Sequence, residues 1–522
     1  MSRRRRATPT ALDRVIGAIS PTMGLRRLQA RQALALVSGY EGGRRGRRAT
    51  EEWRTAAASA NADTLPDLEV LRARSRDLYR NDPLARSAIN TPVTHVVGTG
   101  HVVRPEIDAD MLGLTPEAKA DWERRARAVW RDWAGSVDAD LTRTQTFAEL
   151  EDLGQRSVRL SGDVLVILRF RPRPGRLLAT TLQMVEADRV SNPTGMRDGP
   201  RLAGGVELDD DGAPLAYHVS DRHMIDLGRT GGLNWTRVPA WAADGSRNVL
   251  HLHGVRERPD MTRYVPDLAP VIETLKQRSR YAEAELMAAV VNACFAIGLR
   301  TEEGDGSEGL EAAAGATAAL PIRITEPGQI FDLGPNEAVE SFTPGRPSAA
   351  FEPFISALAQ EVGAGVDLPH ELLTKAFNAS YSASRAAIEM AWATFRGARR
   401  RHVVQFCQPV YEAVIAEAVA RRVLDAPGFF GDPLRRRAWL GATWMGPARP
   451  TIDPAKDATA DRAYLDMGAT TRTRIVAERF GEDWEAVEAR LADEAARRLA
   501  DGVATPVHAA ASTPAANPED SE

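Results

Sequence analysis

The most extended run of regularly spaced apolar positions lies in residues 369–423. A short helical turn over residues 369–375 precedes a polar loop over residues 377–384, and a helix of about ten turns follows. Its large apolar side chains recur at steps of three and four residues, which is typical of one packed helix face. They are Ile388, Trp392, Phe395, Val403, Phe406, Val410 and Val414.

Two local features define this predicted helix. Ser382 or Ser384 is expected to cap its start, because a serine hydroxyl there accepts a hydrogen bond from an unpaired backbone N–H. Pro409 lacks the N–H that the helical ladder needs. A kink is therefore predicted between Phe406 and Pro409.

The same spacing predicts further helices along the chain: residues 66–81, 83–97, 115–134, 146–161, 267–297, 351–363, 435–441, 458–467, 473–480 and 483–499. Apolar runs of strand length predict β-strands: residues 163–170, 181–186, 205–209, 214–219 and 249–253, with short pieces in 321–341. Residues 444–447 and 452–457 are expected to be loops. The pattern as a whole predicts an α+β chain that is mainly α-helical, with small β-rich parts.

Composition narrows the class of protein. At 522 residues the chain exceeds a single simple core, and two to four domains are expected. A hydrophobic share of 43% and a charged share of 26% are ordinary for a soluble globular protein. The net charge of −4 argues against a general nucleic-acid-binding protein, which is expected to be strongly basic. Arginine far outnumbers lysine, which either a GC-rich genome or a need for bidentate phosphate contacts explains.

Cysteine and hydropathy point to a soluble protein made in a reducing compartment. Cys294 and Cys407 both lie in apolar helical patterns, so they are interpreted as small buried side chains and not as a disulfide framework. No segment reaches the ~18 apolar residues that span a bilayer. No membrane association is expected.

No motif indicates an enzyme or a cofactor. Walker A, GxGxxG, HExxH, GxSxG and CxxC patterns are absent from the sequence. His251 and His253 alternate on one strand, but a metal site would need a third ligand nearby, so structural histidines are favoured. The same holds for His95 and His101, which are not expected to converge. Neither a catalytic residue nor a metal or other cofactor is predicted.

Two charged segments remain open to more than one interpretation. Basic clusters in residues 1–60 form either a solvated arm or a contact with capsid protein or nucleic acid. Residues 301–315 carry acidic groups and no basic one: Glu302, Glu303, Asp305, Glu308 and Glu311. This segment would repel DNA, attract a basic partner, or simply be a solvated loop.

Several short strings, in their order along the chain, resemble the lambda-type family of tailed-phage portal proteins. They are Tyr40-Glu-Gly-Gly, Arg80-Asn-Asp-Pro-Leu-Ala-Arg86, Val97-Gly-Thr-Gly100, Gly162-Asp-Val-Leu-Val166, Val249-Leu-His-Leu-His253 and Tyr381-Ser-Ala-Ser-Arg-Ala-Ala387. Each string is weak alone, but their order over residues 20–488 is fairly specific. Members of this family form a ring, usually of twelve subunits, at one capsid vertex, through which DNA is packaged and ejected.

The resemblance implies a portal-type subunit made of wing, stem, clip and crown. The implied parts are a basic arm (1–60), the wing (61–264), the first stem helix (265–298), the clip (299–350), the second stem helix (351–369), the tunnel-loop region (370–384), a long kinked helix (385–423), a crown-like helical region (424–500) and a disordered tail (501–522). The DNA-facing tunnel loop would carry Lys375, Asn378, Ser380, Tyr381, Ser382 and Ser384. The clip, with the five acidic residues above, would face the terminase.

The implied partners are other copies of the chain in a ring, double-stranded DNA bound without sequence specificity, the large terminase subunit, the major capsid or scaffold protein, and head-completion proteins. The implied location is the capsid vertex of the virion, after assembly in the host cytoplasm. Two other hypotheses stay open: a different capsid-associated structural protein, and a cytosolic enzyme whose site is assembled from scattered residues.

Overall fold

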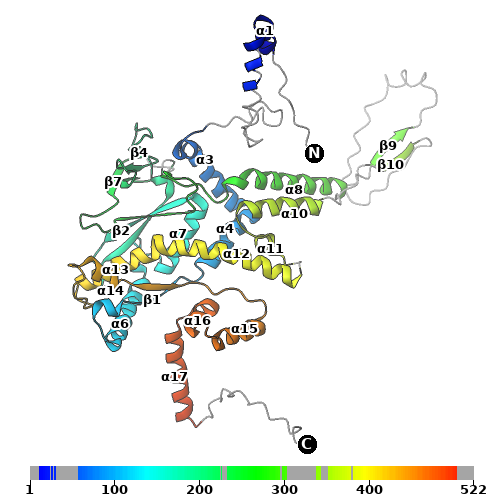
Figure 1. The fold of residues 1–522 in the computed structure, drawn as a ribbon. Coiled ribbons are helices and arrows are strands. Elements are labelled where there is room, and N and C mark those ends of the chain that lie inside the picture. The colour runs from blue at the N-terminus through cyan, green and yellow to red at the C-terminus, as the bar shows by residue number, and fades with distance from the viewer. Residues whose placement is uncertain are drawn as a thin grey trace, which may run out of the picture. The chain divides into compact units, whose positions relative to one another are not determined.

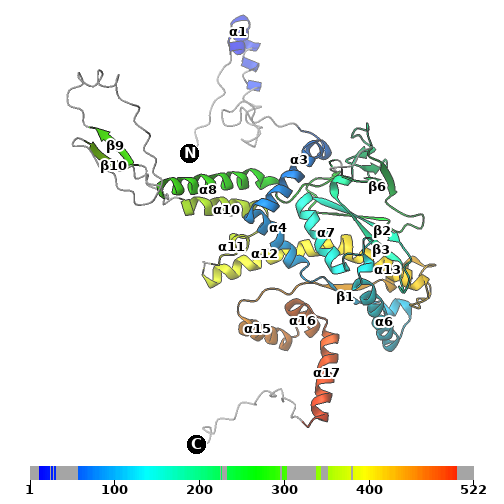
Figure 2. The same cartoon turned by 180° about the vertical axis from the view of Figure 1, so that it is seen from behind.

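A computed structural model describes most of the chain: residues 11–23, 25–27, 29–30, 57–223, 225, 232–293, 297–301, 337–341, 351–377 and 380–502. The chain divides into two units, residues 1–59 and 60–522. The first unit, predicted as a basic arm with a helical pattern over residues 21–38, contains helix α1 (Ala11–Ile19). The elements described below belong to the second unit (Figures 1 and 2).

The second unit is mainly helical, which confirms the predicted α+β class. Its helices are α3 (Ala60–Asn81), α4 (Pro83–Val96), α5 (Ala109–Leu112), α6 (Pro116–Ala134), α7 (Phe147–Ser161), α8 (Ile272–Ala293), α10 (Phe351–Gly365), α11 (His370–Thr374), α12 (Tyr381–His402), α13 (Gln408–Ala420), α14 (Pro433–Trp439), α15 (Pro454–Asp466), α16 (Arg472–Phe480) and α17 (Trp484–Ala500). Among the described residues, no helix has the length and hydropathy needed to cross a membrane.

The strands of the described residues form four small antiparallel sheets. Their bounds are β1 (Val102–Pro105), β2 (Asp163–Phe170), β3 (Thr180–Val185), β4 (Leu202–Ala203), β5 (Val206–Leu208), β6 (Pro214–Ser220), β7 (Trp235–Pro239), β8 (Val249–His253), β9 (Ile297–Thr301), β10 (Glu337–Ser341) and β11 (Ala442–Met445). The sheet orders are β3-β2-β8, β4-β5-β6-β7, β1-β11 and β9-β10. The predicted strands at 163–170, 181–186 and 249–253 and the β5-β6 hairpin are confirmed.

Three large hydrophobic cores and one small cluster of Ala60, Met261 and Tyr264 lie among the described residues. The largest joins the tryptophan-rich face of α6 to α7, α13 and residues 424–445. A second packs α3, α4 and α11 against α12 and the first turn of α8. A third lies between the β2 and β6 sheets. Both views show α8 and α10 side by side.

Some predicted boundaries are wrong. The helix predicted over 267–297 begins only at Ile272, after a 3-10 turn, and ends at Ala293, because residues 297–301 pair with β10 instead. Residues 444–447, predicted as a loop, include the end of β11, which pairs with an unpredicted strand, β1. Helix α3 begins at Ala60, so Pro66 lies inside it. The predicted strands within residues 321–336 fall outside the described residues.

Asp82 links two helices through its carboxylate. Oδ1 caps α4 by accepting from the N–H groups of Leu84 and Ala85, at 2.8 and 3.0 Å. Oδ2 accepts from Arg278 Nη2 and Ser279 Oγ on α8, at 2.8 and 2.9 Å. Burial opposes the charge, but the hydrogen bonds from Ala85 and Arg278 outweigh it and keep the pKa of Asp82 below its ordinary value.

Replacing Asp82 with alanine is expected to cost about 2–3 kcal/mol, because a helix cap and a partly buried charged hydrogen bond are lost together. Asp82→Asn keeps a capping oxygen and should lose less. Hydrogen exchange of the α4 and α8 backbone amides measures this local stability. Equal protection in wild type and the alanine variant would contradict the linking role.

Candidate functional site

The predicted tunnel loop connects α11 to α12. Lys375 ends α11 in the left-handed conformation, with φ of 58°. Ser380 is the residue that caps α12, accepting from the N–H of Ala383 at 3.4 Å, so the prediction of Ser382 or Ser384 as the cap is wrong. The cause is that α12 starts at Tyr381, one residue before Ser382.

The described loop residues differ in exposure. Ser380, Tyr381 and Ser382 are exposed, whereas Ser384 is buried in the first turn of α12. Ser384 is only 8% exposed and offers little surface to DNA, and its predicted role in the tunnel loop stays a prediction. Asn378 lies outside the described residues, as do the clip residues Glu302, Glu303, Asp305, Glu308 and Glu311.

The long helix is interrupted just before Pro409. A π-helical turn, Val403–Cys407, separates α12 from α13, and Pro409 is the second residue of α13. The N–H of Gln408 donates to the carbonyl of Val403, five residues back. A π turn commonly accompanies a bend, while the predicted kink itself stays a prediction. The predicted apolar face is confirmed at Phe395, Phe406, Val410 and Val414, which are all buried.

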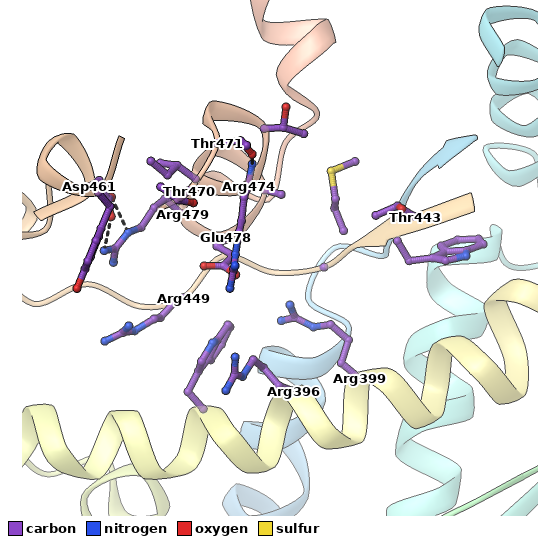
Figure 3. A pocket seen from close by; sticks show the side chains of 18 of the residues that line it. Arg396, Arg399, Thr443, Arg449, Asp461, Thr470, Thr471, Arg474, Glu478 and Arg479 are labelled. Carbon is purple, nitrogen blue, oxygen red and sulfur yellow. Dashed lines mark hydrogen bonds and ion pairs between the residues drawn. The ribbon is translucent and has the colours of Figure 1, made fainter. Parts of the chain in front are cut away.

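A pocket of about 780 Å³ lies between α12, β11 and α16 (Figure 3). Arginines and carboxylates share its lining: Arg104, Arg396, Arg399, Arg449, Arg474 and Arg479 against Glu106, Glu389, Asp461 and Glu478. Six cations and four anions give the lining a formal charge of +2. The pocket therefore favours an anionic group, although its own carboxylates compete for the arginines.

Two arginines of α12 give the pocket its excess charge. Arg399 donates to the carbonyls of His95 and Pro447, at 3.0 and 2.8 Å, and burial lowers its pKa to about 10. Arg396 is exposed and has no carboxylate partner in the described part of the chain. By contrast, Arg479 is paired with Asp461, at 2.9 Å.

The predicted histidine pairs take structural places. His95 stacks on Phe395, with ring centroids 5.0 Å apart, whereas His101 stacks on His402, with ring centroids 5.8 Å apart. His253 stacks on Tyr264 at 4.0 Å, and burial lowers its pKa to about 4. His251 lies 3.3 Å from the carboxylate of Asp163. These contacts agree with the preference for structural histidines.

Sequence reasoning missed a buried polar cluster that we call the His101 cluster: His101, Glu151, His402 and Cys407. Their ligand-type atoms all lie within 4.8 Å of one another, and each residue is buried. Glu151 Oε1 lies 2.7 Å from His101 Nδ1, and it accepts from Cys407 Sγ at 2.9 Å. Burial opposes the charge of Glu151, but hydrogen bonds from His101 and Cys407 keep its pKa below the ordinary value.

Comparison with known proteins defines the class. A family model described as "Phage portal protein, lambda family" matches residues 46–399. The match covers more than half of the chain, which therefore belongs to the lambda family of phage portal proteins. This confirms the family resemblance.

Curated relatives agree over nearly the full length. The chain is 28% identical to the portal protein of Escherichia phage N15 over 510 residues, covering 92% of this chain and 94% of that protein. It is 26% identical to portal protein B of Escherichia phage lambda over 506 residues, covering 92% and 93%. A chain from the neck of a native GTA particle, computed with C12 symmetry, is 14% identical with a TM-score of 0.40, covering 79% and 98%. The family assignment depends on the sequence matches and not on that low TM-score.

Proposed function

We propose that the chain forms a closed ring at the unique vertex of a phage capsid, through which double-stranded DNA is packaged and later leaves. The match of residues 46–399 to the lambda-family portal model is the observation that carries the proposal. The ring would dock the large terminase subunit during packaging and head-completion proteins afterwards. It would be assembled in the host cytoplasm, contact the major capsid or scaffold protein, and take no catalytic step itself.

The proposed parts of such a subunit can be assigned along the chain. Helices α8 and α10 would be the stem, the β-containing region before α8 the wing, and residues 299–350 the clip. Residues 424–445 pack in the same core as α6, so in this scheme they belong to the wing. The crown would then begin after Met445 and not at residue 424.

Exposed apolar side chains support association with further copies. On α8, Leu286 and Met287 are 68% and 64% exposed, and Val290 is 51% exposed. Helices α15, α16 and α17 bury none of their residues fully. Exposed apolar surface of this extent is typical of an interface, and in a ring the neighbouring subunits would cover it.

The loop before α12 suits a channel in which DNA must slide. Each phosphate that a protein neutralises adds a counterion-release contribution to affinity, and ~6–10 contacts already make binding strongly salt-dependent. The exposed Ser380, Tyr381 and Ser382 are uncharged and Lys375 is the nearest cation before them. Each subunit would thus offer few lasting phosphate contacts.

The purified full chain is expected to assemble into a closed ring. Twelve chains of 56.8 kDa would weigh about 680 kDa, and native mass spectrometry distinguishes this from neighbouring subunit numbers. Negative-stain images should show a central hole. A monomer or dimer under every buffer condition would overturn the proposal, and so would an annulus with the α11–α12 loop on its outer rim.

Substitutions on α8 test whether its exposed apolar side chains form an interface between subunits. Leu286→Glu together with Met287→Glu is expected to shift the ring toward monomers, because charged side chains at an apolar interface lose their hydration without a partner. The matched control places glutamate at Met111, which is 41% exposed on α5. Sedimentation velocity measures the ring fraction, and an unchanged fraction in the α8 variant would contradict the assignment of this surface.

A further inference from the structure

We propose that the His101 cluster is a structural zinc site that fastens the long helix to the wing. The inference goes beyond the portal function and does not depend on ring formation. It contrasts with the expectation from sequence that the chain holds no metal. Three observations support it: the donor set, the unpartnered buried histidine nitrogens, and the π turn that brings two of the donors together.

The donor set fits zinc. Cysteine sulfur, histidine nitrogen and carboxylate oxygen are each ligand types that zinc takes, and four such donors complete a tetrahedral site. One thiolate and one carboxylate would together neutralise the two positive charges of Zn²⁺. This matters in a buried site, because an uncompensated charge is costly to bury. All four residues are buried, and four protein donors would fill a tetrahedral shell and leave no position for water, which is typical of a structural and not a catalytic zinc.

Three donor atoms lie around Glu151 Oε1 at separations near those of a zinc site, and all four lie within 4.8 Å of one another. Tetrahedral zinc with bonds of about 2.0–2.3 Å holds its ligand atoms roughly 3.3–3.7 Å apart. Glu151 Oε1 lies 2.7 Å from His101 Nδ1, 2.9 Å from Cys407 Sγ and 3.9 Å from His402 Nε2. Shifts of less than about 1 Å around Glu151 would give these three contacts zinc-like spacing.

Hydrogen bonding alone leaves part of the cluster unexplained. Glu151 is well satisfied, since Oε2 also accepts from the backbone N–H of His101 at 3.0 Å. The Nε2 atoms of His101 and His402, however, are buried without any hydrogen-bond partner. Buried polar atoms are nearly always paired. A cation held by His402 Nε2 would remove one of these two exceptions.

The π turn explains how His402 and Cys407 share one side of the helix. Residues five apart on an α-helix point about 140° away from each other, at 3.6 residues per turn. In a π turn the hydrogen bond closes over five residues, which brings positions i and i+5 nearly above one another. The turn Val403–Cys407 immediately follows His402 and includes Cys407. π turns of this kind are frequent at functional sites.

The site would join three segments that are remote in sequence. His101 directly precedes β1, Glu151 lies on α7, His402 directly precedes the π turn, and Cys407 is the last residue of that turn. Gly100 allows the backbone before β1 to lie close to α7. A Cβ atom at residue 100 would lie 2.6 Å from the Cβ atom of Ala148 and 3.2 Å from Glu151 Oε2. Zinc would therefore fix the point where the long helix meets the wing.

Metal content of the full-length protein tests the proposal. The chain is purified without chelators and without a polyhistidine tag, and zinc is measured by plasma mass spectrometry. About one zinc per chain is expected. Replacing zinc with Co²⁺ should give the near-ultraviolet absorption of a thiolate–cobalt bond and the intense visible bands of tetrahedral cobalt. Wild-type protein with neither zinc nor a thiolate–cobalt band would overturn the proposal and leave a purely hydrogen-bonded cluster.

Matched variants locate the site. Cys407→Val nearly conserves the buried volume and should lower zinc from about one to less than about a tenth per chain. His402→Gln should lower it as well. Cys294→Ser and His95→Gln, which change the other cysteine and a histidine outside the cluster, should keep full zinc. Circular dichroism checks that each variant is folded. Full zinc in folded Cys407→Val, or loss of zinc in Cys294→Ser, would place the metal elsewhere and overturn the assignment.

Discussion

Replacing Asp163 with alanine is expected to destabilise the chain by about 3–5 kcal/mol, because the change removes the carboxylate shared by two buried arginines and leaves Arg72 only a longer contact with Asp188, at 3.4 Å. Asp163 accepts from Arg72 Nη2 at 2.8 Å and from Arg263 Nε and Nη2 at 2.8 and 2.9 Å. The backbone N–H of Tyr264 also donates to it, at 3.2 Å. Asp163 and Arg263 are 0% and 2% exposed as side chains, so the ion pair lies away from bulk water.

Urea unfolding followed by tryptophan fluorescence measures the loss. The control is Asp210→Ala, which removes an exposed partner of Arg201. Exposed ion pairs contribute little to stability, so this variant should unfold as wild type does. If Asp163→Ala and Asp210→Ala shifted the unfolding midpoint equally, the network around Asp163 would not have the assigned role.

The same carboxylate predicts a dependence on pH. Burial alone would raise the pKa of Asp163, but the guanidinium groups of Arg263 and Arg72 hold it well below the ordinary value. A depressed pKa in the folded state stabilises the protein above the unfolded-state pKa of about 3.9, and that stabilisation is lost as pH falls toward the folded-state pKa. The stability difference between wild type and Asp163→Asn should therefore be constant from about pH 7 to 5 and shrink below about pH 4. A difference that persists undiminished to about pH 3 would contradict this account.

Helices with a regular apolar period are predicted well from the sequence. The helices predicted over 115–134 and 146–161 agree with α6 and α7 within one residue at each end. Both combine a threonine cap with an apolar face, so local and tertiary preferences agree. The first residue of α12 is harder to predict from the sequence. Ser380, Ser382 and Ser384 are each able to cap a helix, and only the backbone conformation selects among them.

Contacts between residues that are far apart in the chain are not predicted from the sequence. Strand β1 has only four residues and pairs with β11, more than 300 positions away, so neither shows a period of its own. The His101 cluster is similar: its nearest pair in sequence, His402 and Cys407, is brought together by a π turn that α-helical periodicity does not anticipate. The Gly162-Asp163 string is recognisable in the sequence, but only the structure explains why glycine is needed at its first position. A Cβ atom at Gly162 would lie 2.0 Å from the carbonyl oxygen of Tyr264.

Deleting residues 378–382 is expected to spare ring assembly and to reduce DNA-filled heads on the order of tenfold, since loops placed on a rigid scaffold often carry function. The cores that hold α11 and α12 involve Leu373, Ala391 and Phe395, which the deletion leaves in place. Native mass spectrometry measures assembly, and the DNA content of purified heads measures packaging and retention.

The deletion also removes Ser380, the cap of α12, so loss of the cap needs a separate control. Ser380→Ala removes the cap at a cost of about 1 kcal/mol but keeps the length of the loop. If the loop acts at the narrowest point of the channel, Ser380→Ala should package DNA normally while the deletion does not. Normal full-length packaging by the deletion variant would remove the tunnel role from this loop. Equal defects in both variants would assign the effect to the helix start, because shortening the loop would then add nothing.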